Sequence, residues 1–212
     1  MTKVIPFFGN SPENIRCLHS CIKSILAFYF PGKSFTDEDI DINTMQTDGW
    51  AWLPPFLVWL SNLGLDVRLY PTSGFLYQRL ADEGEIYLRE CLGENYFIQE
   101  RNGAFKNLIF LQETTRKMIA KGLCDNDSIS TENLESELAN DNVLAVGKTV
   151  YEWLDRNQGS TGHYVVLIKK YSPGVWKVHD PGLPHKENRK IAQEFEGRCM
   201  LGDVMLVKGI LN

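Results

Sequence analysis

The sequence predicts one α+β domain in which helices come first and an antiparallel sheet follows. An apolar rhythm of helical period runs from Cys17 to Phe30. Runs rich in β-branched and aromatic residues, which favour strands, gather after residue 143. The turn signal Ser-Pro-Gly at 172–174 joins two of these runs into a hairpin. This order of elements is typical of the α+β class.

The first half of the chain is expected to be mainly helical. Positions 18, 21, 22, 25, 26 and 29 share one face of the first helix, which Pro31-Gly32 ends. The acidic segment 34–48 is expected at the surface. A second helix is predicted near 53–63, followed by a short strand, LDVRLY. Residues 75–124 have a mostly helical pattern that breaks at RNGAFKN.

The second half is expected to form the sheet. It opens with a helix, TENLESELAND, whose start is capped by Ser130 or Thr131. Strands are then predicted from NVLAVGKTV, HYVVLIKKY, VWKVHD and DVMLVKGIL. We expect HYVVLIKKY and VWKVHD to pair as antiparallel neighbours, because they flank the Ser-Pro-Gly turn.

The composition excludes several classes of function. The 212 residues carry a net charge of -5 without a basic block, which disfavours a nucleic-acid partner. No apolar run approaches the roughly 20 residues of a membrane span, and no signal-peptide pattern opens the chain. The 5 cysteines are irregularly spaced, so we expect a reducing, cytoplasmic location rather than a disulfide framework. No phosphate-binding glycine loop or metal cluster is visible, and no cofactor is expected.

Two cysteines stand four residues apart at the start of the first predicted helix. A structural zinc site would need a second cysteine pair, which the sequence lacks, and this helical spacing suits a disulfide poorly. Cys21 falls on the apolar stripe, so we interpret it as a core residue. Cys17 sits where an irregular lead-in becomes a helix, and the unpaired N–H groups there favour a thiolate. Cys17 is therefore a candidate nucleophile.

A nucleophilic cysteine needs a base, and the predicted hairpin offers one. His163 opens the first strand of the hairpin and Asp180 closes the second, so the pairing should bring them together. A carboxylate beside an imidazole fixes its tautomer and stabilises its charged form. Cys17, His163 and Asp180 thus form a candidate nucleophile, base and orienting acid. Taken singly, each is also explained as an ordinary core, strand-edge or turn residue.

These residues resemble the bacteriocin-processing, or double-glycine-leader, peptidase-like family of papain-like cysteine peptidases. CLHSCIKSILAFYFPG is similar to the family's nucleophile helix, which places the nucleophile on Cys17. GHYVVLIKKYSPGVWKVHDPG is similar to its second block, which places the base on His163 and the orienting acid on Asp180. The resemblance implies a papain-like fold over most of the chain, with 75–124 as a helical insertion.

The chain departs from the family pattern at the helix start and upstream of it. The family's Gly-Pro after the cysteine is Leu18-His19 here, and the family's oxyanion-binding Gln is replaced by Asn10 in IPFFGN. Asn keeps the amide donor but is one methylene shorter, so Asn10 or Asn14 would have to complete the oxyanion hole. Losing one such donor costs roughly 3 to 4 kcal/mol of transition-state stabilisation.

The resulting expectation is a cysteine hydrolase that cleaves a peptide or protein substrate through a thioester. The same parts would serve an acyltransferase or an amidase. Two other classes stay open: a binding or regulatory module that keeps the fold without catalysis, and an unrelated α+β domain in which these residues are structural. The sequence identifies neither the substrate nor the oligomeric state.

Overall fold

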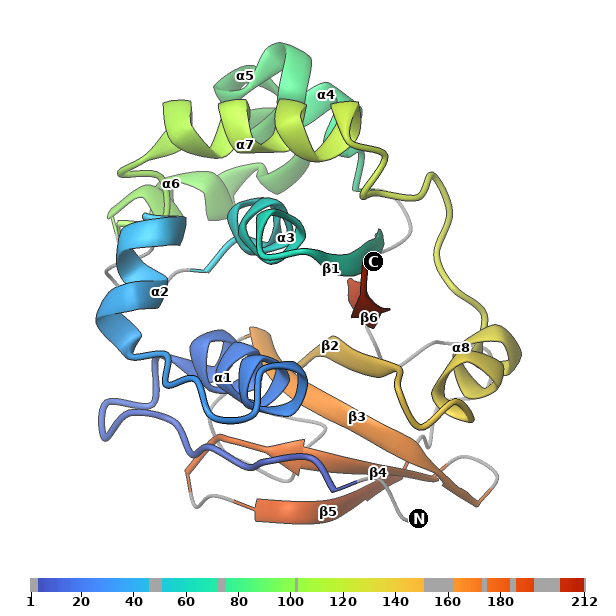
Figure 1. Ribbon diagram of the computed structural model, residues 1–212. Helices are drawn as coiled ribbons and strands as arrows, with labels where there is room; N and C mark the ends of the chain where they lie inside the picture. Colours follow the sequence, from blue (N-terminus) through green and yellow to red (C-terminus); the bar gives the residue numbers. More distant parts are fainter. Residues whose placement is uncertain are drawn as a thin grey trace.

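The computed structural model describes residues 4–45, 51–71, 75–101, 103–150, 162–172, 175–183, 186–192 and 203–211. Within these ranges the chain is a mixed α+β structure with 8 helices and an antiparallel sheet of 6 strands (Figure 1). The predicted α+β class is confirmed. No helix in the described part of the chain combines the length and apolar character that a membrane span requires.

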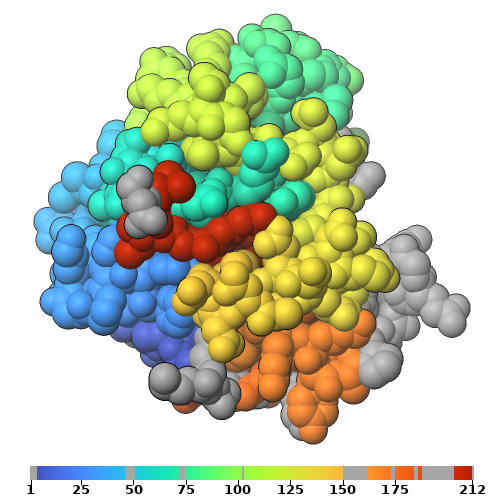
Figure 2. Space-filling model, turned by 45° about the vertical axis from the view of Figure 1, so that its right-hand side comes forward, coloured from blue at the N-terminus to red at the C-terminus, as the bar shows by residue number. Residues whose placement is uncertain are grey.

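The helices lie mostly in the first two thirds of the chain. They are α1 (Cys17–Tyr29), α2 (Asp37–Thr44), α3 (Leu53–Asn62), α4 (Tyr77–Glu83), α5 (Glu85–Leu92), α6 (Glu94–Arg101), α7 (Leu108–Ala120) and α8 (Thr131–Leu138). The helical character predicted for 75–124 is confirmed by α4 to α7, and the predicted break falls between α6 and α7. In Figure 2 these helices, coloured green to yellow-green, form the upper part of the molecule.

The strands form one sheet in the order β1-β6-β2-β3-β4-β5, with every neighbouring pair antiparallel. They are β1 (Leu65–Tyr70), β2 (Leu144–Val150), β3 (Gly162–Ser172), β4 (Val175–Asp180), β5 (Lys186–Ala192) and β6 (Val204–Ile210). The strand predicted from LDVRLY is confirmed as β1, within the helical half of the chain. It pairs with β6, so the last strand joins the two halves of the chain, which was not predicted.

A hydrophobic core lies on each face of the sheet. On one face α1 packs against alternate residues of the central strands, such as Val166, and α3 packs against the edge strand β1. On the other face α8 packs against the residues between them, such as Ala145 and Val165. This division follows from the period of two along a strand, which sends successive side chains to opposite faces.

Helix α1 forms as its apolar rhythm predicts. Its stripe is buried against β3 and β6 through Leu18, Cys21, Ile22, Ile25 and Leu26. The helix ends where the Phe30 N–H donates to the Leu26 carbonyl and the chain turns at Gly32, whose φ of +92 is costly for other residues. Packing of this stripe fixes the direction in which α1 presents its first residue.

Two elements were not predicted. Helix α2 lies in the segment interpreted only as acidic surface, and its start is a capping box between Thr36 and Asp39. The spacing of Thr36 and Asp39 was the available signal. Strand β5 pairs with β4 at the edge of the sheet, and its sequence, KENRKIA, lacks the apolar alternation by which strands are recognised.

Candidate active site

The antiparallel pairing of β3 and β4 brings His163 and Asp180 into contact. His163 is the second residue of β3 and Asp180 is the last residue of β4. The His163 Nε2 and Asp180 Oδ1 atoms are 2.8 Å apart, and both side chains are 0% exposed. The Gly182 N–H also donates to Asp180 Oδ1, at 3.0 Å. The carboxylate is thus held by the imidazole and by the backbone that follows β4.

The second ring nitrogen of His163 faces Cys17. Burial lowers the pKa of His163, but hydrogen bonds with Asp180 and Cys17, and the negative charges of both, together raise it above its usual value. The imidazole therefore stands between a carboxylate and a thiol. An imidazole in this position can take a proton from the thiol and hold it, because the resulting imidazolium is stabilised on both sides.

Cys17 is the first residue of α1 and is half-buried. Its place follows from the packing of α1 on β3, which sets the helix start beside the beginning of that strand. Cys21, one turn later, is 1% exposed, and burial is the main reason that its pKa is well raised. Of the two cysteines in the predicted helix, Cys21 is a neutral core thiol and Cys17 faces the imidazole.

Asn10 lies beside these residues, and its hydrogen bonds connect three segments of the chain. Its backbone N–H donates to the Pro181 carbonyl at 2.9 Å, just after β4. Its side-chain Oδ1 accepts from the backbone N–H of Ser11, at 2.8 Å, and of Arg16, at 2.6 Å. These two donors fix the orientation of the amide, since only the oxygen can accept them. The carbonyl end of Asn10 therefore faces the start of α1.

The amide nitrogen of Asn10 is turned toward Asn14. It donates to Asn14 Oδ1 at 2.9 Å, and that oxygen also accepts from the Leu183 N–H at 3.1 Å. A side-chain amide carries two N–H donors, so this bond uses one of them. Asn14 itself adopts a left-handed φ of 59, which turns the lead-in toward α1. The structure thus brings Asn10 and Asn14 to the helix start as one hydrogen-bonded pair.

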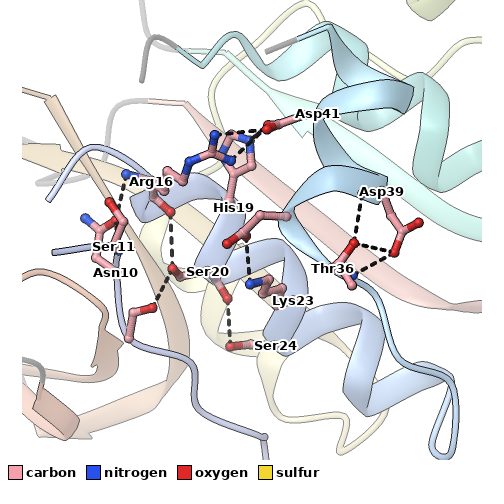
Figure 3. Close-up of polar contacts among 12 residues, drawn as sticks. Asn10, Ser11, Arg16, His19, Ser20, Lys23, Ser24, Thr36, Asp39 and Asp41 are labelled. Atoms are coloured by element: carbon pink, nitrogen blue, oxygen red, sulfur yellow. Dashed lines mark hydrogen bonds and ion pairs between the residues drawn. The ribbon is translucent and has the colours of Figure 1, made fainter. Parts of the chain in front are cut away.

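A charged cluster beside Cys17 was not predicted (Figure 3). The Arg16 guanidinium donates to both oxygens of Asp41, at 3.0 and 2.9 Å, and His19 Nε2 lies 3.0 Å from Asp41 Oδ1. Asp41 lies on α2, so the cluster joins α2 to the first turn of α1. Burial, and then the Arg16 charge, lower the pKa of His19 despite Asp41. His19 points to α2 and is not the partner of Cys17.

The other sequence candidates lie elsewhere. His179 Nε2 contacts the Ile5 carbonyl at 3.1 Å and its ring packs on Phe7, so it anchors the N-terminal lead-in to β4. His185 and Cys199 lie outside the described residues. Cys91 is exposed on α5, and burial is the main reason that the pKa of Cys124 is raised to about 12.

The structure therefore brings the four predicted site residues together where the start of α1, the start of β3 and the end of β4 meet. They are Cys17, His163, Asp180 and Asn10. The chemistry available there is proton transfer from a thiol to a buried imidazole that a carboxylate supports. No protein-family model matches the chain, and no curated protein sequence matches it significantly.

Proposed function

We propose that this protein is a cysteine hydrolase with a papain-like fold, which cleaves an amide bond of a peptide or protein through a thioester. The observation that carries the proposal is the position of His163, in contact with Asp180 on one side and Cys17 on the other. The helix-before-sheet arrangement, with the cysteine at a helix start and the imidazole on a strand, also supports it.

The reaction follows from these contacts. His163 accepts the Cys17 proton, and the thiolate sulfur attacks the carbonyl carbon of the scissile amide. The C–N bond then breaks as His163 gives its proton to the leaving nitrogen, which departs as an amine. A water molecule, deprotonated by His163, attacks the thioester, and the C–S bond breaks to release a carboxylic acid and the free thiol. Asp180 stabilises the imidazolium at each protonated stage.

The oxyanion formed in each attack requires hydrogen-bond donors near the Cys17 sulfur. The first N–H groups of α1 suit this role, since they have no acceptor within the helix and point toward its positive end. The remaining N–H of the Asn10 amide is the second donor in this proposal. For Asn10 to donate this hydrogen bond, the substrate carbonyl must approach the start of α1 from the side on which Asn10 and Asn14 lie.

Selective alkylation tests the nucleophile. The native chain is treated with a limiting amount of iodoacetamide at about pH 6, where an ordinary thiol of pKa near 8.5 is almost wholly protonated. Peptide mapping should find the label on Cys17 and not on the exposed Cys91. His163→Ala should abolish this selectivity, while Cys91→Ala, the matched control, should leave it intact. Labelling of Cys17 and Cys91 at equal rates would refute the proposal.

A binding module without catalysis is the second candidate. It is favoured by the orientation of Asn10, whose carbonyl oxygen rather than its nitrogen faces the helix start. A reactive Cys17 combined with no turnover of a broad peptide library would support the module. Turnover with an added amine or thiol as acceptor would instead assign an acyltransferase.

A further inference from the structure

The lead-in before α1 carries Asn10 but forms neither helix nor strand between residues 4 and 16. A turn closed by the Asn14 N–H and the Ser11 carbonyl, at 2.9 Å, lies within it. Arg16, the last residue before the helix, has a non-helical ψ of 32, and the hydrogen bonds of α1 begin at its carbonyl. The place of Asn10 is therefore set by contacts other than the hydrogen bonds within α1.

Separate hydrogen bonds hold the backbone and the side chain of Asn10. Its backbone N–H donates to the Pro181 carbonyl, and its amide nitrogen donates to Asn14 in the same lead-in. Its Oδ1 accepts from Ser11, which is the next residue and moves with it, and from Arg16 at 2.6 Å. The bond from the Arg16 N–H thus connects the side-chain amide to the start of α1.

Asp41 holds residues before and after Cys17 from a separate helix (Figure 3). Its carboxylate accepts from both terminal nitrogens of the Arg16 guanidinium, at 3.0 and 2.9 Å, and lies 3.0 Å from His19 Nε2. A two-point contact of this kind fixes the orientation of the guanidinium as well as its distance. The Arg16 and Asp41 side chains are only 21% and 18% exposed, so salt and water weaken this pair less than an open surface pair.

The position of Asp41 is in turn set by the packing of α2. The neighbouring Ile40 is 0% exposed, as is Thr44 in the last turn, and α2 packs on α3. The first turn of α2 is closed by the capping box of Thr36 and Asp39. A packed helix therefore presents the carboxylate of Asp41 to an irregular lead-in that needs external support.

We propose that Asp41 and Arg16 are positioning residues for the oxyanion hole: Asp41 holds Arg16, and the Arg16 N–H holds the Asn10 amide in the orientation that serves the substrate carbonyl. The inference rests on the proposed function, in which Asn10 is the second oxyanion donor. Neither positioning residue touches the substrate. Misplacing a group by about 1 Å can cost roughly a hundredfold in rate. Acylation of Cys17 should therefore depend on Asp41.

Two reagents separate the oxyanion hole from the nucleophile without knowledge of the substrate. With 4-nitrophenyl acetate, the thiolate sulfur bonds to the carbonyl carbon, an oxyanion forms, and the C–O bond breaks to release 4-nitrophenolate. With iodoacetamide, the same thiolate bonds to a saturated carbon and iodide leaves, so no oxyanion forms. The ratio of acylation to alkylation rates at Cys17 is independent of the thiolate population and measures the oxyanion hole. Cys17→Ala gives the background rates.

The variants differ in how they disturb the Asn10 amide. Asn10→Ala removes it and should lower the ratio about a hundredfold. Asp41→Asn only releases it and should lower the ratio on the order of tenfold. Arg16→Lys keeps the charge, loses the two-point contact and should act in the same direction. Asp37→Asn is the matched control, because Asp37 joins α2 to α1 through Lys23, at 2.7 Å, and it should leave the ratio unchanged.

A double variant tests whether Asp41 acts through Asn10. In the Asn10→Ala background, Asp41→Asn should lower the ratio no further, because the amide that Asp41 positions is gone. An equal fall in both backgrounds would show that Asp41 acts by another route and would overturn the inference. An unchanged ratio in Asp41→Asn and Arg16→Lys, where Asn10→Ala lowers it, would also overturn it. In both cases the hydrolase proposal stands.

Failure of the underlying proposals gives different results. If Cys17 is selectively alkylated but Asn10→Ala leaves the ratio unchanged, Asn10 is not an oxyanion donor. The inference is then refuted, and Cys17 keeps its role as nucleophile. If Cys17 of the wild-type protein is not selectively alkylated, the hydrolase proposal is refuted together with the inference.

Discussion

Replacing Asp180 by Asn tests how the site holds a charged imidazole. The variant keeps the shape of the side chain, and its amide oxygen can still accept from His163 and Gly182. It removes the negative charge that opposes the effect of burial on His163. Without that charge, burial should dominate and the pKa of His163 should fall.

The size of this effect follows from the bond that changes. A hydrogen bond to a charged group contributes about 1.5 to 3 kcal/mol, against about 0.5 to 1.5 kcal/mol for a neutral one. The difference is about 1 to 1.5 kcal/mol, close to one pKa unit, or roughly tenfold in the population of the imidazolium. Proton transfer from Cys17 to His163 should therefore be less favourable, and alkylation of Cys17 near pH 6 should be about tenfold slower.

The assay is the rate of Cys17 alkylation by iodoacetamide between about pH 5 and pH 9. Wild-type protein should keep a substantial rate at acidic pH, and Asp180→Asn should move the rise in rate up by about one pH unit. Asp125→Asn removes a carboxylate that pairs with Arg68 at 3.1 Å, away from the proposed site, and should leave the profile unchanged. A folded Asp180→Asn protein with the wild-type profile would refute the role of Asp180.

The remaining predictions concern residues around the site. Cys21→Ala should cost about 1 kcal/mol of unfolding free energy in urea melts without changing Cys17 alkylation, since Cys21 is a core thiol. Asp41→Asn should cost about 1 to 3 kcal/mol in the same melts, because it removes the charge that Arg16 and His19 share. His163→Gln should remove the loss of stability that this group causes as pH rises above about 6.5, a slope of up to about 1.4 kcal/mol per pH unit.

The sign of this last prediction comes from the shifts in pKa. The pKa of His163 is raised on folding, so its contribution to stability is present below its unfolded value and is lost as pH rises through its folded value. The pKa values of His19 and His179 are lowered, so their contributions are lost as pH falls below their unfolded value of about 6.5. The contribution of His163 is constant below about pH 6.5, so removing it should change the pH dependence of stability only above that pH.

Local patterns predicted the elements that build the centre of the site. The apolar rhythm after Cys17 predicted α1, and the run HYVVLIKKY with its turn predicted β3 and its pairing with β4. The contact of His163 with Asp180 followed from that pairing, because a hairpin brings the start of one strand beside the end of the other. These elements could be predicted from the sequence because the signals for each of them lie within about 20 consecutive residues.

Contacts between segments that are far apart in the sequence could not be predicted in this way. Asp41 lies 25 residues from Arg16, in a short polar helix with little periodicity, so its contact with Arg16 depends on how α2 packs. The orientation of Asn10 depends on Arg16 and Asn14 together, and no residue pattern encodes which end of an amide faces a helix.

By itself, the sequence therefore determined, to within one residue at each end, the helix and strands that carry Cys17, His163 and Asp180. Only the tertiary structure decided that β1 joins the sheet beside β6, that Asp41 binds Arg16 and His19, and that Asn10 Oδ1 accepts from the Arg16 N–H. The physical reason is that periodicity and turn chemistry act between near neighbours along the chain. Ion pairs and side-chain contacts between separate elements are selected only when the elements pack, since packing sets which charges are close and how far they are shielded from water.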